Sequence, residues 1–201
     1  MTQSHRSAHD VLTSVKEKLS SAWGKNPAEV LEQVIEELHE GRGYFWTGLY
    51  LAAGNKVVRQ CFRGPVPPCH SFQLGVGNVG TTGQTGLIKV IPDVSADPTY
   101  SMCFLETKSE IVVPVKIATR ILGVIDVESD RLNAFSSQER ALLEQAAEHI
   151  ARFLTTNQGK LLLRKAREQS SKVAAETEPH KAPKSERPEK SRAAAGDRVG
   201  R

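Results

Sequence analysis

Two apolar segments joined by a short turn constrain the fold of this chain more than any other feature of its sequence. Residues 110–117 and 121–127 are almost entirely aliphatic, and residues 118–120 separate them. Segments of this length and composition on either side of a turn predict a β-hairpin. Because both arms carry apolar residues on both faces, the hairpin is expected near the centre of a sheet that is covered on both sides.

Shorter segments predict the remaining strands. Residues 44–51 and 56–62 are aromatic and aliphatic runs separated by a glycine-containing turn, which indicates a second antiparallel pair. Residues 87–91 form a further short apolar run. The proline-rich residues 64–68 are expected to be irregular, and residues 92–108 to form a long loop.

Apolar residues at helical spacing predict two helices before the first strand and a long helix after the hairpin. The second helix begins at Asn26-Pro27 and ends at Gly41, and Ser136 with Glu139 forms a capping box that opens the last helix. The apolar face of the first helix comprises Leu12, Val15, Leu19 and Trp23. The predicted fold is of the α/β class in its α+β form, with an antiparallel sheet flanked by N-terminal and C-terminal helices.

The chain is expected to form one domain, because single domains typically run to about 150 residues. Residues 1–169 are assigned to this domain, with its core at about 27–156, and residues 170–201 to a tail. The tail has three prolines, no aromatic residue and only two valines as large aliphatic residues. Since so little apolar surface cannot offset the entropy of ordering, we expect the tail to be disordered.

The positive charge is concentrated in this tail. Residues 170–201 contain eight Lys or Arg and five acidic residues, which accounts for +3 of the net charge of +4. Residues 1–169 are therefore nearly neutral and lack the basic stripe that nucleic-acid-binding domains use. No apolar run approaches the roughly 20 residues that cross a bilayer, and the polar start lacks the apolar core of a signal peptide. We expect a cytoplasmic protein that binds neither nucleic acid nor membranes.

Three acidic residues are predicted to gather at one end of the hairpin. Asp126 and Glu128 are two residues apart and therefore share one face of their strand. Leu122 and Val124 are expected on the same face, and Glu110 begins the partner strand. The simplest interpretation places the carboxylates at the solvent-exposed end of the strands. Alternatively, such a cluster binds an ammonium group or supplies a proton, because mutual repulsion raises the pKa of at least one member.

The cysteines at positions 61, 69 and 103 are expected to be reduced, because an odd number without a secretion signal argues against a disulfide framework. Cys61 lies within a strand and is expected to be buried filler, whereas Cys103 lies in a loop where a thiol is reachable. Four residues could in principle act as zinc ligands, namely Cys61, Cys69, His70 and Cys103. Their spacing contains no paired Cys-x-x-Cys motif, so we expect no metal.

Residues 75–80, Gly-Val-Gly-Asn-Val-Gly, formally match the dinucleotide-binding fingerprint. That fingerprint requires a long helix after it, within alternating strands and helices. Gly83 and Gly86 interrupt the following segment, and no such alternation surrounds it. We therefore expect a glycine-rich turn at the rim of a pocket.

Several motifs occur in a specific order and cover about half of the chain. They are residues 44–50, residues 64–66 with Cys69, residues 75–77 with Gly80, residues 93–94, the segment around Cys103, residues 109–114 and residues 123–129. In this combination the chain resembles a GAF domain, and specifically the free methionine-(R)-sulfoxide reductase branch of that superfamily. The first helices and the tail lie outside the strongest match.

The resemblance implies a catalytic mechanism. Cys103 is similar to the cysteine that attacks the sulfoxide sulfur, and a carboxyl group on Glu110, Asp126 or Glu128 would protonate the departing oxygen. The resulting sulfenic acid would condense with Cys69 to a disulfide, which a thioredoxin-type dithiol would reduce. The implied activity is that of an L-methionine (R)-S-oxide reductase without a metal or organic cofactor.

The same resemblance assigns substrate contacts. The remaining acids would hold the substrate ammonium group, and the family's aromatic positions fall on Trp46 and Tyr50. Two positions depart from the family: Glu128 replaces the usual Asp, and Val79 occupies the place of a third cysteine.

Val79 keeps a second interpretation open, in which the chain is a non-catalytic GAF module that binds a small ligand and signals through its flanking helices. A third interpretation makes the basic tail an adaptor for acidic surfaces. The amphipathic terminal helices are also compatible with a homodimer.

Overall fold

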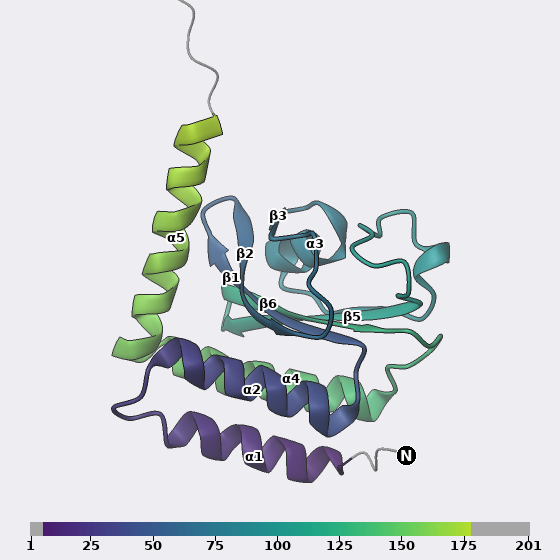
Figure 1. Ribbon diagram of the computed structural model, residues 1–201, viewed down its shortest axis with the longest axis horizontal. Helices are drawn as coiled ribbons and strands as arrows, with labels where there is room; N and C mark the ends of the chain where they lie inside the picture. The colour runs from purple at the N-terminus through teal and green to yellow at the C-terminus, as the bar shows by residue number, and fades with distance from the viewer. Residues whose placement is uncertain (1–5, 178–201) are drawn as a thin grey trace, which may run out of the picture.

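The computed structural model describes residues 6–177 and shows a curled, six-stranded antiparallel sheet with helices on both of its faces (Figure 1). The strands are β1 (Trp46–Ala53), β2 (Lys56–Arg63), β3 (Ser71–Gln73), β4 (Lys89–Ile91), β5 (Ser109–Ile117) and β6 (Arg120–Ser129). Their order is β3-β2-β1-β6-β5-β4, so β5 and β6 both lie in the interior of the sheet. The predicted central hairpin is therefore confirmed, together with the α+β fold.

The helices form two layers on one face of the sheet and a thinner cover on the other (Figure 1). They are α1 (Ala8–Ser20), α2 (Pro27–Arg42), α3 (Gly77–Thr85), α4 (Ser137–Leu154) and α5 (Asn157–Thr177), with a short 3₁₀ turn at Val94–Ala96. Helices α2 and α4 pack on the sheet, and α1 packs across both of them. Helix α3 packs on the opposite face, over β5 and β6. The main core lies between the sheet and the α2–α4 layer, where burial of apolar surface stabilises the fold.

The end of α2 differs from its prediction. Gly41 was expected as the left-handed exit, but Gly43 adopts that conformation, with φ 62°, and caps the helix. Gly41 remains inside the helix, where a Cβ would lie 2.6 Å from a methyl carbon of Val11. Glycine at position 41 therefore allows α1 to approach α2 closely.

Trp23 was predicted on the apolar face of α1, and this prediction is wrong. Helix α1 ends at Ser20, and the hydroxyl groups of Ser20 and Ser21 donate to carbonyl groups of its last turn. Ala22 takes the buried position that follows, and Trp23 is 93% exposed. Local side-chain hydrogen bonds thus end the helix before Trp23 can join its face.

Leu122 was predicted on the same face of β6 as the acidic residues, and it lies on the other one. The register shifts so that Val115 pairs with Gly123 while Lys116 pairs with Ile121. Leu122 is therefore the extra residue of a bulge and joins the core beneath the sheet. Val124 stays on the predicted face.

The predicted tail begins too early, because α5 continues past residue 169 to Thr177. Leu162, Leu163 and Ala166 anchor the helix on the core, and the hydroxyl group of Ser170 donates to the carbonyl oxygen of Ala53 at 3.3 Å. Once a helix is nucleated, each further residue adds a hydrogen bond at little cost. Residues 178–201 of the predicted tail lie outside the described residues.

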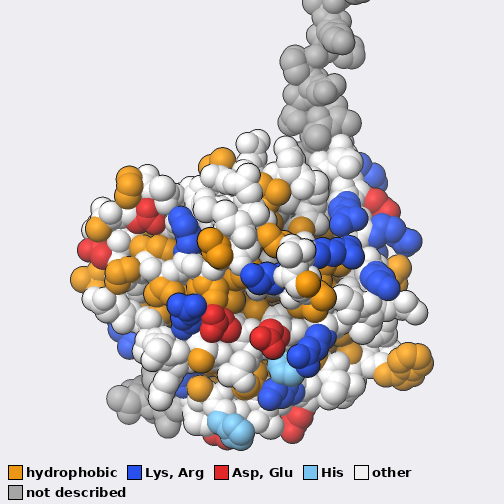
Figure 2. Space-filling view, turned by 180° about the vertical axis from the view of Figure 1, so that it is seen from behind, with side chains coloured by type: hydrophobic (Ala, Val, Ile, Leu, Met, Phe, Trp, Pro, Cys, Tyr) orange, Lys and Arg blue, Asp and Glu red, His pale blue; other side chains and the backbone are white. Residues whose placement is uncertain are grey.

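Basic side chains gather over α5 (Figure 2). They include the exposed Lys160, Arg164, Lys165, Arg167 and Lys172. The expectation that residues 1–169 lack a basic stripe therefore does not hold for α5. The helix contains no aromatic residue, so it offers no platform for stacking nucleic-acid bases. Within residues 6–177, no helix combines the length and apolar character that crossing a bilayer requires.

Ser136 caps α4 as predicted, since its side chain accepts a hydrogen bond from the Glu139 amide at 3.3 Å. Replacing Ser136 by Ala should lower the free energy of unfolding by about 1 kcal/mol, because an amide of the first turn loses its partner. Urea denaturation of the purified variant measures this difference. The neighbouring Ser137→Ala variant is the control and should stay within about 0.5 kcal/mol of the wild type; equal losses in both variants would contradict the cap.

Candidate functional site

The face of the sheet opposite α2 and α4, which we call the site face, carries an aromatic cluster and the predicted site residues. Its buried apolar members are Trp46, Tyr50, Val57, Phe72, Val79, Phe104, Val112 and Val124. Cys69 and Cys103 pack against this cluster. Two cysteines from separate loops are thus brought onto the same face as the aromatic residues.

Trp46 and Tyr50 lie on β1 at alternate positions, with Gly48 between them. A Cβ on Gly48 would lie 2.1 Å from a ring carbon of Trp46, so the indole ring occupies the space above this glycine. The ring centroids of Trp46 and Tyr50 are 6.3 Å apart. Among the described residues, the buried indole nitrogen of Trp46 has no hydrogen-bond partner. That N–H is therefore an unused hydrogen-bond donor on the site face.

The three predicted acids come together on the site face, and we refer to them as the acidic site. Glu110 lies directly opposite Glu128 in the β5–β6 ladder, and Asp126 pairs with Val112 one step along the same face. Glu110, Asp126 and Glu128 are only 3%, 2% and 3% exposed. The interpretation that placed them at a wet strand end is therefore wrong, because the aromatic cluster and the loops over the sheet exclude solvent from them.

Burial raises the pKa of all three carboxyl groups. The pKa of Glu110 is raised to about 8 by burial and by the nearby Glu128, although a hydrogen bond from Asn78 acts in the opposite direction. Burial also raises the pKa of Glu128 to about 7, against hydrogen bonds from Thr107 and Tyr100. The pKa of Asp126 lies well above its usual value because of burial and the charges of its two neighbours. The acidic site therefore retains protons at neutral pH.

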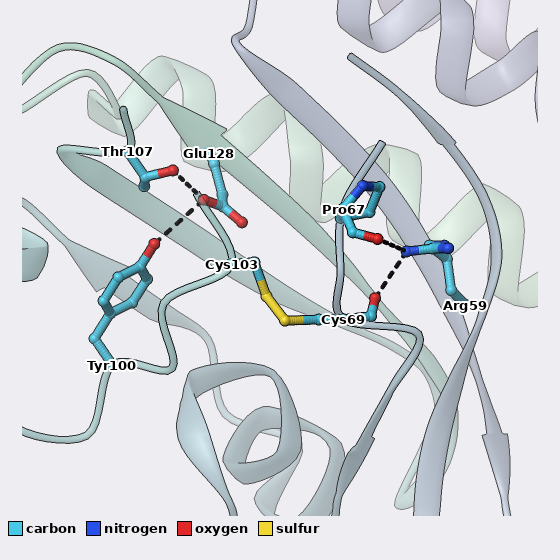
Figure 3. Close-up of a disulfide and its surroundings, with 7 residues drawn as sticks. All are labelled: Arg59, Pro67, Cys69, Tyr100, Cys103, Thr107 and Glu128. Carbon is cyan, nitrogen blue, oxygen red and sulfur yellow. Dashed lines mark hydrogen bonds between the residues drawn. A yellow bond between two sulfur atoms is a disulfide. The ribbon is translucent and has the colours of Figure 1, made fainter. Parts of the chain in front are cut away.

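Cys69 and Cys103 are joined in a disulfide, with their Cα atoms 6.0 Å apart (Figure 3). The general expectation of reduced thiols is therefore wrong for this pair, while the pairing implied by the family resemblance is the one that the structure contains. The remaining thiol, Cys61, lies in the core beneath the sheet. Burial raises the pKa of Cys61 to about 12, so its thiol is inert at neutral pH.

Each cysteine loop is held to the sheet by an ionisable side chain (Figure 3). Arg59 on β2 donates to the carbonyl oxygen of Cys69 at 2.7 Å and to that of Pro67 at 3.3 Å. On the other side, the hydroxyl groups of Tyr100 and Thr107 both donate to Glu128. These two hydroxyl groups flank Cys103 in the chain, so Glu128 restrains the Cys103 loop from both ends.

Asn78 was not among the residues predicted for the site, yet it lies at the centre of the polar contacts. Residues 77–85 form α3, not the glycine-rich turn that was expected. The amide nitrogen of Asn78 donates to Glu110 at 2.6 Å and to Asp97 at 3.0 Å. The only signal for this role was one polar side chain among the glycines of residues 75–80.

Val79 follows Asn78 in α3 and is buried in the aromatic cluster. Cys69 and Cys103 pack against the same cluster. An apolar side chain therefore fills the position at which the family resemblance implies a third cysteine.

A groove of about 960 Å³ lies away from the acidic site, between α4 and the end of the hairpin. It is lined by Leu87, Ile117, Arg140 and Glu144 among others and shares no residue with the site face cluster. The residues that line this groove include no cysteine or histidine. The site face is therefore the better candidate for a catalytic site.

Comparison with known proteins gives a consistent result. The family model described as "GAF domain" matches residues 26–154. GAF domain-containing protein A of Dictyostelium discoideum is 37% identical over 116 residues, which are 57% of this chain and 73% of that protein. Free methionine-R-sulfoxide reductase of Saccharomyces cerevisiae is 35% identical over 109 residues, 52% of this chain and 60% of that protein. The structure of free methionine-R-sulfoxide reductase from Neisseria meningitidis with its substrate superposes with a TM-score of 0.66 at 27% identity, covering 81% of this chain and 91% of that one.

Proposed function

Because the chain belongs to the GAF domain family, we propose that its acidic site reduces free L-methionine-(R)-sulfoxide to methionine. A GAF fold alone does not define an activity, so the proposal depends on the site. The observation that carries it is a disulfide between two loop cysteines beside three buried carboxyl groups that retain protons. The similarity to the yeast and Neisseria reductases supports the same activity.

In the first step, the thiolate of Cys103 attacks the sulfoxide sulfur. This attack forms a sulfur–sulfur bond while a carboxyl group of the acidic site protonates the sulfoxide oxygen. The protonated oxygen then passes to the Cys103 sulfur as the S–O bond to the substrate and the new sulfur–sulfur bond break, so methionine leaves and Cys103 becomes a sulfenic acid. Glu110 and Asp126 are in contact on the site face and both have raised pKa values, which suits this pair to supply the proton near neutral pH.

In the second step, the thiol of Cys69 condenses with the sulfenic acid, releasing water and forming the disulfide. A thioredoxin-type dithiol then reduces this disulfide by exchange and becomes oxidised itself. Two electrons thus pass from the dithiol to the sulfoxide in each cycle. The anchors on Arg59 and Glu128 keep the two cysteine loops facing each other through the cycle.

The substrate contacts use the rest of the site face. Trp46 lies against the methyl-sulfoxide end, with Tyr50 beside it, and the ionised carboxylates of the acidic site receive the ammonium group. Opening the disulfide is expected to make room for the substrate, because Cys69 and Cys103 pack directly on this cluster.

A non-catalytic ligand-binding module is the second candidate function. It is favoured by Val79, which fills the place of the third family cysteine with an apolar side chain. Such a module would use the acidic site only to bind an amino-acid ligand, without transfer of electrons.

Turnover by the reduced, full-length protein separates the two candidates. With free L-methionine-(R)-sulfoxide and dithiothreitol, we expect methionine to form catalytically, whereas the (S)-epimer should give at least about tenfold less product. Chromatographic analysis of methionine measures both. Binding of the sulfoxide without any methionine would reject the reductase and support the binding module.

A further inference from the structure

Asn78 is almost fully buried, at 2% exposed, and both the nitrogen and the oxygen of its side-chain amide make hydrogen bonds. Both N–H groups of its amide reach carboxylates, Glu110 at 2.6 Å and Asp97 at 3.0 Å. Its amide oxygen accepts a hydrogen bond from the ammonium group of Lys89 at 2.7 Å. The Thr99 hydroxyl group lies 3.1 Å from the same oxygen. The charges around Asn78 therefore dictate its orientation, because the reverse orientation would place the amide oxygen between two carboxylates.

Asp126 has no comparable donor. Among the described residues, its Oδ1 atom is buried and without a hydrogen-bond partner. The neighbouring group within hydrogen-bond reach is the carboxyl group of Glu110. Two carboxylates repel each other, so this contact becomes a hydrogen bond only when one of the pair keeps a proton.

We propose that Asn78 is a positioning residue of the acidic site, which holds Glu110 in one orientation as the hydrogen-bond acceptor and leaves Asp126 as the carboxyl group that carries the proton. Its consequence for catalysis rests on the proposed function. The order in which Glu110 and Asp126 ionise is argued from the hydrogen bonds alone and does not depend on turnover.

Hydrogen bonding explains the direction of this effect. A donated N–H stabilises the charged form of a carboxyl group and therefore lowers the pKa of Glu110, which burial otherwise raises. The other charged or titratable groups that face Glu110 are Asp126 and Glu128 from β6, Asp97 and Tyr100 from the Cys103 loop, and Lys89 from β4. The charges of Glu128 and Asp97 disfavour ionisation of Glu110, whereas its hydrogen bonds with Asn78 and Asp126 favour it. The positive charge of Lys89, which donates to the Asn78 oxygen, acts in the same direction as those hydrogen bonds. Glu110 should therefore ionise before Asp126.

The same amide connects the acidic site to the Cys103 loop. Asp97 accepts hydrogen bonds from Asn78 at 3.0 Å and from the Thr99 backbone amide at 2.8 Å. Partial burial alone would raise the pKa of Asp97, but its hydrogen bonds with Thr99 and Asn78 outweigh this effect and lower it. Asp97 thus remains ionised and fixes the loop that precedes Cys103 against α3.

Carboxyl titration of the disulfide-bonded, full-length protein tests the proposal without a substrate. With ¹³C-labelled side-chain carboxyl groups, NMR signals are assigned by their loss in Glu110→Gln and Asp126→Asn. In the wild type, Glu110 should ionise at lower pH than Asp126. In Asn78→Asp, which keeps the shape but removes both donors, the Glu110 midpoint should rise by about one pH unit or more, a tenfold change in proton affinity.

Matched variants separate a positioning role from a general disturbance. Gln84→Glu makes the same amide-to-carboxylate change at an exposed position of α3 and should leave the Glu110 midpoint unchanged. Lys89→Met should raise the Glu110 midpoint, whereas Lys89→Arg, which keeps the positive charge, should leave it near the wild-type value. If Asn78→Asp does not fold, as judged by circular dichroism, the Lys89 pair decides. An unchanged Glu110 midpoint in the folded variants, or ionisation of Asp126 before Glu110, would overturn the proposal.

Turnover then tests whether the positioning matters for catalysis. In Asn78→Asp, kcat should fall at least tenfold with its pH profile shifted, while KM changes less than threefold. An inert wild-type protein would reject the reductase activity and leave the titration result standing. Normal turnover with an unshifted pH profile in Asn78→Asp would instead overturn the role of Asn78 alone.

Discussion

Cys103→Ser should abolish methionine formation from free L-methionine-(R)-sulfoxide, with a loss of at least about a thousandfold. A serine hydroxyl group cannot replace the thiolate, because it stays protonated at neutral pH and its oxygen cannot be oxidised to an acid that Cys69 resolves. The measurement is the rate of methionine release under excess dithiothreitol. Retained turnover in this variant would exclude Cys103 as the nucleophile.

Cys69→Ser should separate the two steps of the reaction. The first step does not need Cys69, so one equivalent of methionine should appear in the absence of reductant while a sulfenic acid accumulates on Cys103. Dimedone labelling followed by mass spectrometry detects that acid. Wild-type protein should give one equivalent of methionine and a Cys69–Cys103 disulfide without a dimedone adduct.

Two further variants are matched controls for the cysteine substitutions. Cys61→Ala removes the thiol in the core beneath the sheet and should retain turnover, because that thiol does not reach the site face. Val79→Ala should also retain turnover, since no sulfur is lost there. Loss of activity in Cys61→Ala with an unchanged melting temperature would mean that the two-cysteine scheme is incomplete.

Asp126→Asn should stabilise the folded protein at pH 8 while it removes activity. In the wild type, the raised pKa of Asp126 means that the folded state binds a proton that the unfolded state has released. Folding at pH 8 therefore requires proton uptake, which costs free energy. The cost is about 1.4 kcal/mol for each pH unit, counted upward from the pKa of Asp126 in the unfolded chain. The count stops at pH 8, or at the pKa in the folded protein if that is lower. Asn carries no such cost, and its amide can donate to Glu110. We expect a gain in unfolding free energy at pH 8, measured by denaturation of the disulfide-bonded protein.

The pH dependence of stability follows with a defined sign. Since the pKa values of Glu110 and Glu128 are raised to about 8 and about 7, the folded state binds more protons than the unfolded state from about pH 4.5 upward. The contribution of these groups to stability is fully present below about pH 4.5 and is lost as pH rises through 7 to 8. Asp126→Asn should flatten this fall. The exposed Asp130→Asn is the matched control and should shift stability by less than about 0.5 kcal/mol at any pH. A wild type whose stability rises from pH 5 to pH 8 would contradict the buried acidic site.

Local chemistry was sufficient to predict several elements of the fold. The β5–β6 hairpin follows from two aliphatic runs around a turn, and the start of α2 and of α4 follows from Asn26-Pro27 and Ser136. These signals act between residues close in the chain, so they can be read from the sequence. The end of α1 before Trp23 and the bulge at Leu122 could not be read in this way, because competing hydrogen bonds and strand register decide them.

The acidic site shows the same division. Residue spacing alone placed Asp126 and Glu128 on one strand face, and family resemblance added Cys69 and Cys103. Whether the acids face water or the protein interior was decided only by tertiary structure, since α3 and two long loops close over the sheet. The same closure brings Asn78 to Glu110 across 32 positions of sequence. Sequence by itself therefore determined which residue types and local elements are available; the packing of distant segments decided burial, proton affinity and pairing, because these depend on neighbours that are remote along the chain.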